Sequence, residues 1–143
     1  NQTMTMTQEH TKYKQMQINT ASPGKLILML YQGAIGALKK ASDLLDKKDY
    51  GGKGDCLIKA QDIIMELNMA LDMSAGEVSS SLRQLYTYIY RRLVDANLNM
   101  EKQGIEESIS LLEGLYEAWD KAVQETEGSL QGEVGHSRLS ITG

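Results

Sequence analysis

Apolar residues recur at alternating steps of three and four along four separate stretches of this chain of 143 residues. This spacing places the apolar side chains of each stretch on one face of an α-helix. No stretch shows the strict alternation that is typical of a half-buried β-strand. Four helices of about 20 residues, each about 30 Å long, predict an all-α protein. Because short loops join them, we expect an antiparallel up-down four-helix bundle.

Caps and glycines predict the boundaries of the first two helices. Ser22 and Pro23 are a favoured N-cap residue and a favoured first helical residue, so the first helix is expected to begin there. The glycines in DKKDYGGKGD, residues 46–55, indicate a loop. A second helix is expected at about 55–73. The residues of these two helices that are expected to face the core are Ile27, Leu30, Tyr31, Ala34, Leu38, Ala41, Leu45, Leu57, Ala60, Ile64, Leu67 and Leu71.

Two further helices follow. One is predicted from Val78 until Gly104 interrupts the pattern, and the other from Ile105 until Gly128. Their inward-facing residues are expected to be Leu82, Leu85, Ile89, Leu93, Ala96, Met100, Ile105, Ile109, Leu112, Tyr116, Trp119 and Val123. The ends of the chain lack this period. We therefore expect a mobile N-terminal arm over residues 1–19, a helical bundle domain over 20–127 and a disordered C-terminal tail over 128–143.

Composition excludes several classes of function. The net charge of −4 argues against nucleic acid as the main partner. The longest apolar run, LILMLY, is far shorter than the roughly 20 residues of a membrane span, so no such span is expected. Cys56 is the only cysteine, which rules out a disulfide within the chain and favours a reducing compartment such as the cytoplasm.

The residue types needed for catalysis or metal binding are not brought together by any motif. The only histidines, His10 and His136, lie outside the predicted helices. Cys56 therefore has no histidine partner and is expected to be a small core residue. We predict no enzyme activity, no metal site and no cofactor.

More apolar surface is predicted than one core stripe per helix requires. Met65, Met69 and Met73 follow one another at steps of four on a further side of the second helix. Such a surface can be a wide core stripe, a site for an amphipathic partner or a homodimer interface. Methionine is over-used on surfaces that accept variable apolar partners, which favours the second interpretation.

Three blocks of the sequence resemble the flagellin export chaperones of the FliS family. From Tyr13 the chain has YKQMQINTASPGKLILMLYQGAI, and from Ala60 it has AQDIIMELNMALDMSAGEVSSSLRQLYTYIYRRLVDAN. A third block, LLEGLYEAWDKA, begins at Leu111. Gln32 stands where the family often has Asp. The resemblance implies a helical bundle that binds the C-terminal segment of flagellin in the cytoplasm, prevents its premature polymerisation and hands it to the export apparatus.

A client segment of this kind would be bound in an apolar groove. From the helical spacing we expect the groove to be formed by Ile58, Met65, Met69, Met73, Tyr86 and Tyr90. The apolar residues of the arm, Tyr13, Met16 and Ile18, are expected to cap this groove until the client displaces them. The resemblance also makes Tyr13 a candidate contact for the export gate. A helical adaptor or regulator with a different amphipathic client remains the alternative.

Overall fold

The computed structural model describes the backbone of residues 22–140 and the side chains of residues 22–126. This part of the chain contains helices α2 (Pro23–Asp46), α3 (Tyr50–Met69), α4 (Glu77–Asn99) and α5 (Lys102–Ser140). A short 3₁₀ helix, η1 (Met73–Ala75), lies between α3 and α4. No strand occurs among the described residues, which confirms the predicted all-α class.

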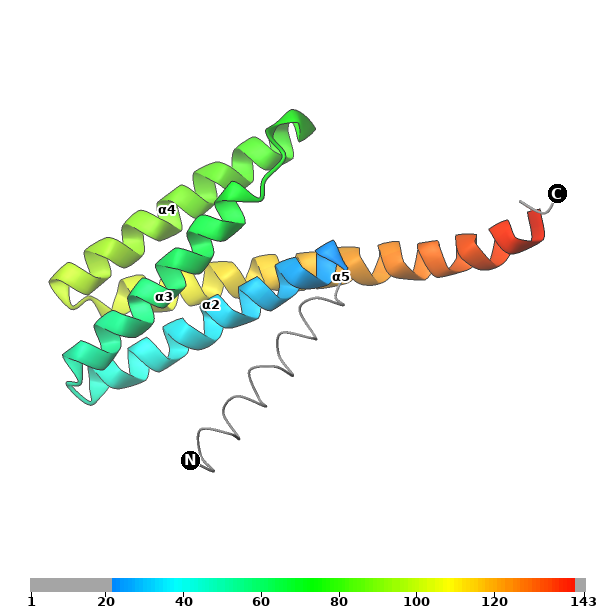
Figure 1. The fold of residues 1–143 in the computed structure, drawn as a ribbon. Coiled ribbons are helices and arrows are strands. Elements are labelled where there is room, and N and C mark those ends of the chain that lie inside the picture. Colours follow the sequence, from blue (N-terminus) through cyan, green and yellow to red (C-terminus); the bar gives the residue numbers. More distant parts are fainter. Residues whose placement is uncertain (1–21, 141–143) are drawn as a thin grey trace, which may run out of the picture.

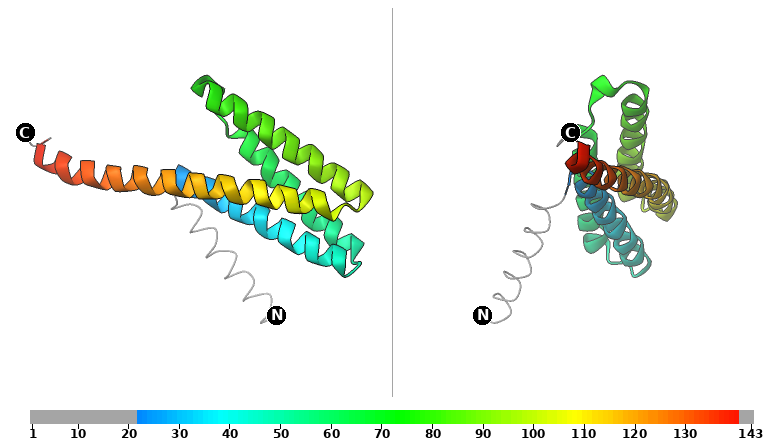
Figure 2. Two further views of the ribbon diagram at one scale, coloured as in Figure 1. Left: turned by 180° about the vertical axis from the view of Figure 1, so that it is seen from behind. Right: turned by 90° about the vertical axis from the view of Figure 1, so that its right-hand side faces the viewer.

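Successive helices run in opposite directions and form an antiparallel bundle (Figure 1). α2 packs against α3 and α5, and α4 packs against the same two helices. The end of the α3–α4 hairpin that carries η1 stands away from α2 and α5 in all three views (Figures 1 and 2). The hairpin therefore has a surface at this end that α2 and α5 do not cover.

The start of α2 agrees with the prediction, whereas the start of α3 does not. The Ser22 side chain accepts a hydrogen bond from the Lys25 backbone N–H at 3.3 Å, and Pro23 is the first helical residue. α3 already begins at Tyr50, because the carboxylate of Asp49 caps it by accepting from the Gly52 N–H at 3.0 Å. A Cβ atom on Gly52 would lie 2.8 Å from this carboxylate. The predicted loop over 46–55 was therefore wrong, since its glycines belong to the first turns of α3.

Two other helix ends differ from the sequence expectation. α4 ends at Asn99 because Met100 adopts a left-handed backbone conformation with φ 55°. Met100 is consequently 47% exposed and not directed inward as predicted. α5 continues through Gly128 to Ser140, so the helix end predicted at Gly128 was wrong. A glycine inside a helix costs only about 1 kcal/mol, which a long helix can tolerate. The division into arm, bundle and tail stays a prediction.

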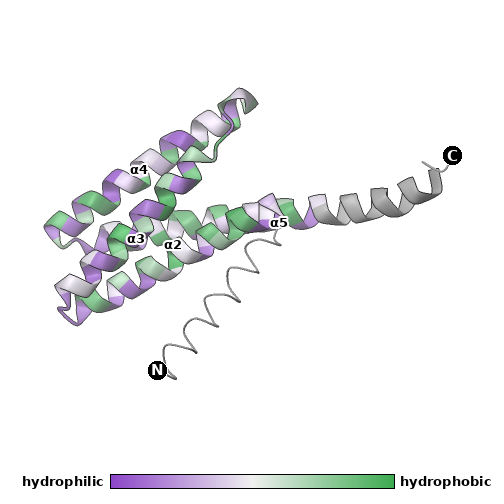
Figure 3. Cartoon of the chain, viewed as in Figure 1, coloured by the Kyte–Doolittle hydropathy of each residue, from purple (hydrophilic) through white to green (hydrophobic). Residues whose placement is uncertain are grey.

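The core of the bundle contains the predicted stripes. Tyr31, Leu38, Leu57 and Leu93 are fully buried, together with residues from the same faces of their helices. Gly33 allows α3 to approach, since a Cβ atom there would lie 3.3 Å from Cδ1 of Ile63. Hydrophobic residues also gather where α2 and α5 run beside each other (Figure 3). The apolar start of α2 is thus covered in part by α5.

Candidate functional site

The outer face of the α3–α4 hairpin carries large apolar side chains that the bundle does not cover. On α3, Ile58, Met65 and Met69 are exposed by 51%, 49% and 76%. On α4, Leu98 is 74% exposed. Exposed apolar residues in such number on one hairpin are typical of a surface that binds a partner. We call this surface the hairpin face, defined by Ile58, Met65, Met69, Met73, Tyr90 and Leu98.

A hollow between α3 and α4 lies on this face. Its apolar floor includes the buried Ile64 and Tyr86, and the half-buried Tyr90 lies beside them. The guanidinium of Arg83 on α4 donates to one residue of the lining, Asn68, reaching its side chain at 3.2 Å and its carbonyl at 3.3 Å. The full lining is Ile64, Met65, Asn68, Tyr86, Thr87, Tyr90 and Arg91.

Tyr86 is more deeply buried than its expected role in a groove requires. Only 2% of its surface is exposed, and its ring centroid lies 6.4 Å from that of Tyr31. The two hydroxyl groups share a hydrogen bond, and Trp119 lies beside both of them. Burial raises the pKa of both phenols above the ordinary value, so both remain neutral donors and acceptors. Tyr86 therefore belongs to the core and contributes only the floor of the hollow.

The other residues predicted for the groove lie on the surface. Ile58, Met65 and Met69 share one side of α3, and Met73 opens η1 with 42% exposure. These residues and the half-buried Tyr90 thus occur on the same hairpin, and their role as a client groove stays a prediction. Tyr13, Met16 and Ile18, which are predicted to cap the groove, lie outside the described residues.

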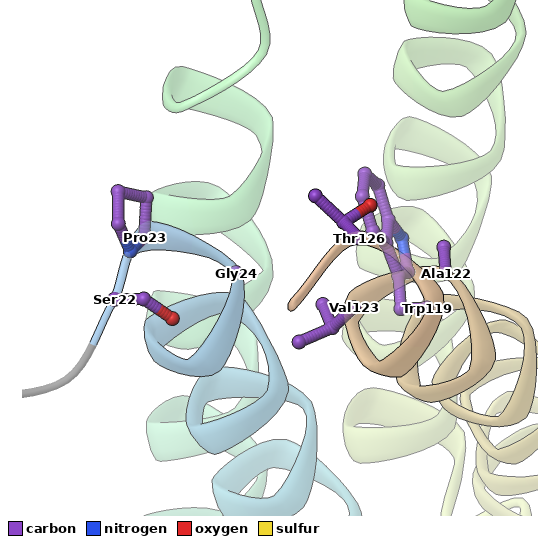
Figure 4. A pocket seen from close by; sticks show the side chains of 7 residues that line it. All are labelled: Ser22, Pro23, Gly24, Trp119, Ala122, Val123 and Thr126. Atoms are coloured by element: carbon purple, nitrogen blue, oxygen red, sulfur yellow. The ribbon is translucent and has the colours of Figure 1, made fainter. Parts of the chain in front are cut away.

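A second apolar pocket, which the sequence did not predict, lies between the start of α2 and α5 (Figure 4). Gly24 allows α2 to approach α5 closely at this pocket, since a Cβ atom there would lie 2.8 Å from Cγ2 of Val123. Its lining consists of Ser22, Pro23, Gly24, Trp119, Ala122, Val123 and Thr126. The sequence contains the residues of this pocket, including the only tryptophan of the chain, Trp119. It does not show that they lie together, because this depends on how α5 packs against α2.

The described residues contain no group of three or more His, Cys, Asp or Glu side chains that could hold a metal ion. Cys56 is partly buried against the core, in agreement with its predicted packing role. Among the described residues, no helix is both long enough and apolar enough to traverse a bilayer. The described surface thus has apolar area for binding on the hairpin face and in the pocket between the start of α2 and α5, which we call the α2–α5 pocket.

Comparison with known proteins gives related chains. Residues 6–126 match the family described as Flagellar protein FliS. The Flagellar secretion chaperone FliS of Bacillus subtilis is 36% identical over 132 residues, which cover 92% of this chain and 98% of the relative. The protein of the same name from Salmonella typhimurium is 43% identical over 104 residues, or 71% of this chain and 77% of the relative.

A solved structure described as a flagellar chaperone from bacteria has the same fold. It superposes with a TM-score of 0.68 and covers 83% of this chain and 98% of its own. The sequence identity of this pair is 23%, so the likeness concerns the arrangement of the helices.

Proposed function

This chain belongs to the FliS family of flagellar secretion chaperones, and on that premise we propose that it binds the C-terminal segment of flagellin in the cytoplasm. Binding would prevent premature polymerisation of flagellin and aid its export. The resemblance noted in the three sequence blocks is confirmed by the family match over residues 6–126. Its curated relatives are named as secretion chaperones and not as enzymes, so its activity is binding rather than catalysis.

The observation that supports this proposal most strongly is the uncovered apolar hairpin face. Ile58, Met65 and Met69 lie on one side of α3, next to the hollow between α3 and α4. A segment that is disordered when free can fold into a helix and bury its apolar face on such a surface. Ordering the client costs about 2–5 kcal/mol of free energy. The burial of its apolar area must therefore contribute a larger favourable free energy for binding to occur.

One charge at the hollow suggests which client side chain lies nearby. Arg91 lines the hollow, is exposed, and makes no ion pair or hydrogen bond with the described residues. Arg83 is by contrast hydrogen-bonded to Asn68. An acidic residue on the polar side of the client helix would pair with Arg91. Because the pair would be solvent-exposed, it would set orientation more than affinity.

The N-terminal arm is long enough to reach the α2–α5 pocket in the absence of the client. An extended chain spans at most about 3.5 Å per residue, so Ile18 can reach about 14 Å from Ser22 and Tyr13 about 30 Å. The α2–α5 pocket begins at Ser22 itself and thus lies within reach of Ile18. We expect Ile18 to use this pocket while Met16 and Tyr13 extend toward the hairpin face. Deletion of residues 1–18 should then raise both apolar-dye binding and client affinity.

Two further partners belong to the proposal. Tyr13 is a candidate contact for the export gate once the client has displaced the arm. A second copy of the chain is the other occupant that the hairpin face could accept. Sedimentation that depends on protein concentration, and that changes when a flagellin peptide is added, would reveal a homodimer competing for this surface.

The proposal is tested by flagellin polymerisation followed by light scattering. The unaltered protein should suppress polymerisation, and Met65→Glu/Met69→Glu should weaken the suppression by roughly 10-fold to 100-fold, because it places charges in an apolar contact. Gln84→Glu/Gln103→Glu is the matched control, since it adds the same charge at exposed polar positions. If both variants are folded and suppress polymerisation equally, the hairpin face is not the surface that binds flagellin.

A further inference from the structure

The described methionines all lie outside the core. The buried apolar residues are Tyr, Leu, Ile and Ala, without a single methionine among the described positions. Met29 is half-buried, and the exposed fractions of Met65, Met69, Met73 and Met100 range from 42% to 76%. The thioether groups of the described part of the chain are therefore confined to its surface.

Three of these methionines occupy one end of the hairpin face. Met65 and Met69 are one turn apart on α3, and Met73 is the first residue of η1. The opposite end of the same face is formed by Ile58 and Leu98, whose side chains contain no oxidisable atom. In α3 the core positions Leu57, Ile64 and Leu67 are aliphatic, whereas the exposed large apolar positions of its last two turns are methionine.

We propose that Met65, Met69 and Met73 form a reversible oxidation site that turns client binding off. This inference rests on the proposed function, because the step it regulates is the docking of an apolar client helix. The oxidant is a peroxide such as hydrogen peroxide. The thioether sulfur attacks one peroxide oxygen, the O–O bond breaks, and the proton on the transferred oxygen passes to the departing hydroxide. The products are a sulfoxide and water, with the sulfur oxidised and the peroxide reduced by two electrons.

The location of these residues limits the effect to binding. A sulfoxide is polar and accepts hydrogen bonds from water, so an oxidised methionine no longer gains by burial against an apolar client. A sulfoxide in a core would unfold the protein, but no described methionine is in the core. The fold therefore persists while the surface changes its polarity. A methionine sulfoxide reductase, which takes two electrons from a dithiol, restores the thioether.

The test uses the full chain before and after treatment with hydrogen peroxide, with the oxidised positions located by peptide mass. Affinity for a flagellin C-terminal peptide is measured by calorimetry, and folding by thermal melting. The matched variant is Met65→Leu/Met69→Leu/Met73→Leu, which keeps the apolar volume but cannot form a sulfoxide at these positions. The remaining methionines stay available for oxidation in both proteins.

Oxidation should weaken peptide binding by the unaltered chain about 100-fold, as expected when three apolar contacts become polar. The leucine variant should lose less than about threefold, a small change on the affinity scale, and neither melting temperature should fall appreciably. Methionine sulfoxide reductase should restore the affinity of the unaltered chain. An equal loss in both proteins, or undiminished binding by the oxidised chain, would overturn the oxidation site.

A failure of the proposed function would look different. If the untreated chain does not bind the peptide at all, the flagellin assignment fails. An apolar fluorescent dye then reports the polarity of the hairpin face directly. Dye binding should fall on oxidation of the unaltered chain and persist in the leucine variant. The same fall in both proteins would contradict the inference independently of the client.

Discussion

Tyr31 and Tyr86 join two helices of the bundle through their rings and their hydroxyl groups. They belong to α2 and α4, which are not neighbours in the chain, and their hydroxyls share a buried hydrogen bond. Such a bond is stabilising only while both partners are present, since a buried hydroxyl without a partner pays its desolvation cost. Tyr86 also forms part of the floor of the hollow, so the same contact fixes the shape of the hairpin face.

Substitution of these tyrosines by phenylalanine tests this interpretation. Tyr31→Phe and Tyr86→Phe should each lower the free energy of unfolding by about 1–2 kcal/mol. The double variant should lose less than the sum of the two, because it leaves neither hydroxyl without its partner. Denaturant unfolding of the four proteins of this cycle gives the coupling energy. Strictly additive losses would show that the two hydroxyls do not depend on each other.

At the scale of the helices, Gly104 and Gly114, both in α5, have opposite surroundings. A Cβ atom on Gly104 would lie 3.1 Å from Cβ of Ala96 and 3.4 Å from the carbonyl oxygen of Arg92, where α4 approaches. A Cβ atom on Gly114 would meet no atom within 4 Å. The first glycine is therefore required by packing, whereas no contact in the described structure requires the second.

This difference predicts opposite signs for the same substitution in one helix. Gly114→Ala should raise the free energy of unfolding by about 0.5–1 kcal/mol through helix propensity. Gly104→Ala should lower it by about 1 kcal/mol or more, because the backbone of α4 cannot yield to the added methyl group. The measurement is the denaturant concentration at the midpoint of unfolding, compared between proteins whose unfolding transitions have the same m-value. A stabilised Gly104→Ala protein would show that α4 and α5 can separate at this point without cost.

The limits of prediction from sequence also appear at this scale. The apolar period predicted the class, the order and the core faces of the helices, because burial of one stripe per helix dominates their packing. It did not predict the burial of Lys53, which lies in the GGKG stretch and is only 2% exposed. The Lys53 ammonium donates to the Asn97 carbonyl at 3.1 Å and to the Met100 sulfur at 3.0 Å. These partners belong to the end of α4, which no local pattern near Lys53 reveals.

The candidate site was predictable in part, for a similar reason. Ile58, Met65 and Met69 lie on an exposed side of α3 because their spacing follows the helical period. Tyr86 was expected in the groove but is buried in the core. The helical spacing is compatible with both positions, and the hydroxyl of Tyr31 on α2 gives the buried Tyr86 hydroxyl its hydrogen-bond partner. The α2–α5 pocket is built from residues about 100 positions apart, so only the folded arrangement reveals it.

At the scale of the whole molecule, the bundle leaves the hairpin face uncovered, where a partner can bind. The α3–α4 hairpin provides this face, while α2 and α5 provide a separate apolar pocket beside Ser22, next to the N-terminal arm (Figures 1 and 4). A client that folds on binding would bury the hairpin face and become helical at the same time. Coupled folding of this kind has a thermodynamic signature that simple surface adhesion lacks.

The most direct measurement is a calorimetric titration of the full chain with a peptide of the C-terminal segment of flagellin, which is expected to fold on binding. We predict one-to-one binding, a large negative heat-capacity change and a gain of helix by circular dichroism. Met65→Glu/Met69→Glu should weaken this binding, whereas Gln84→Glu/Gln103→Glu should not. Absence of binding by the folded protein would contradict the account and point to a different helical client.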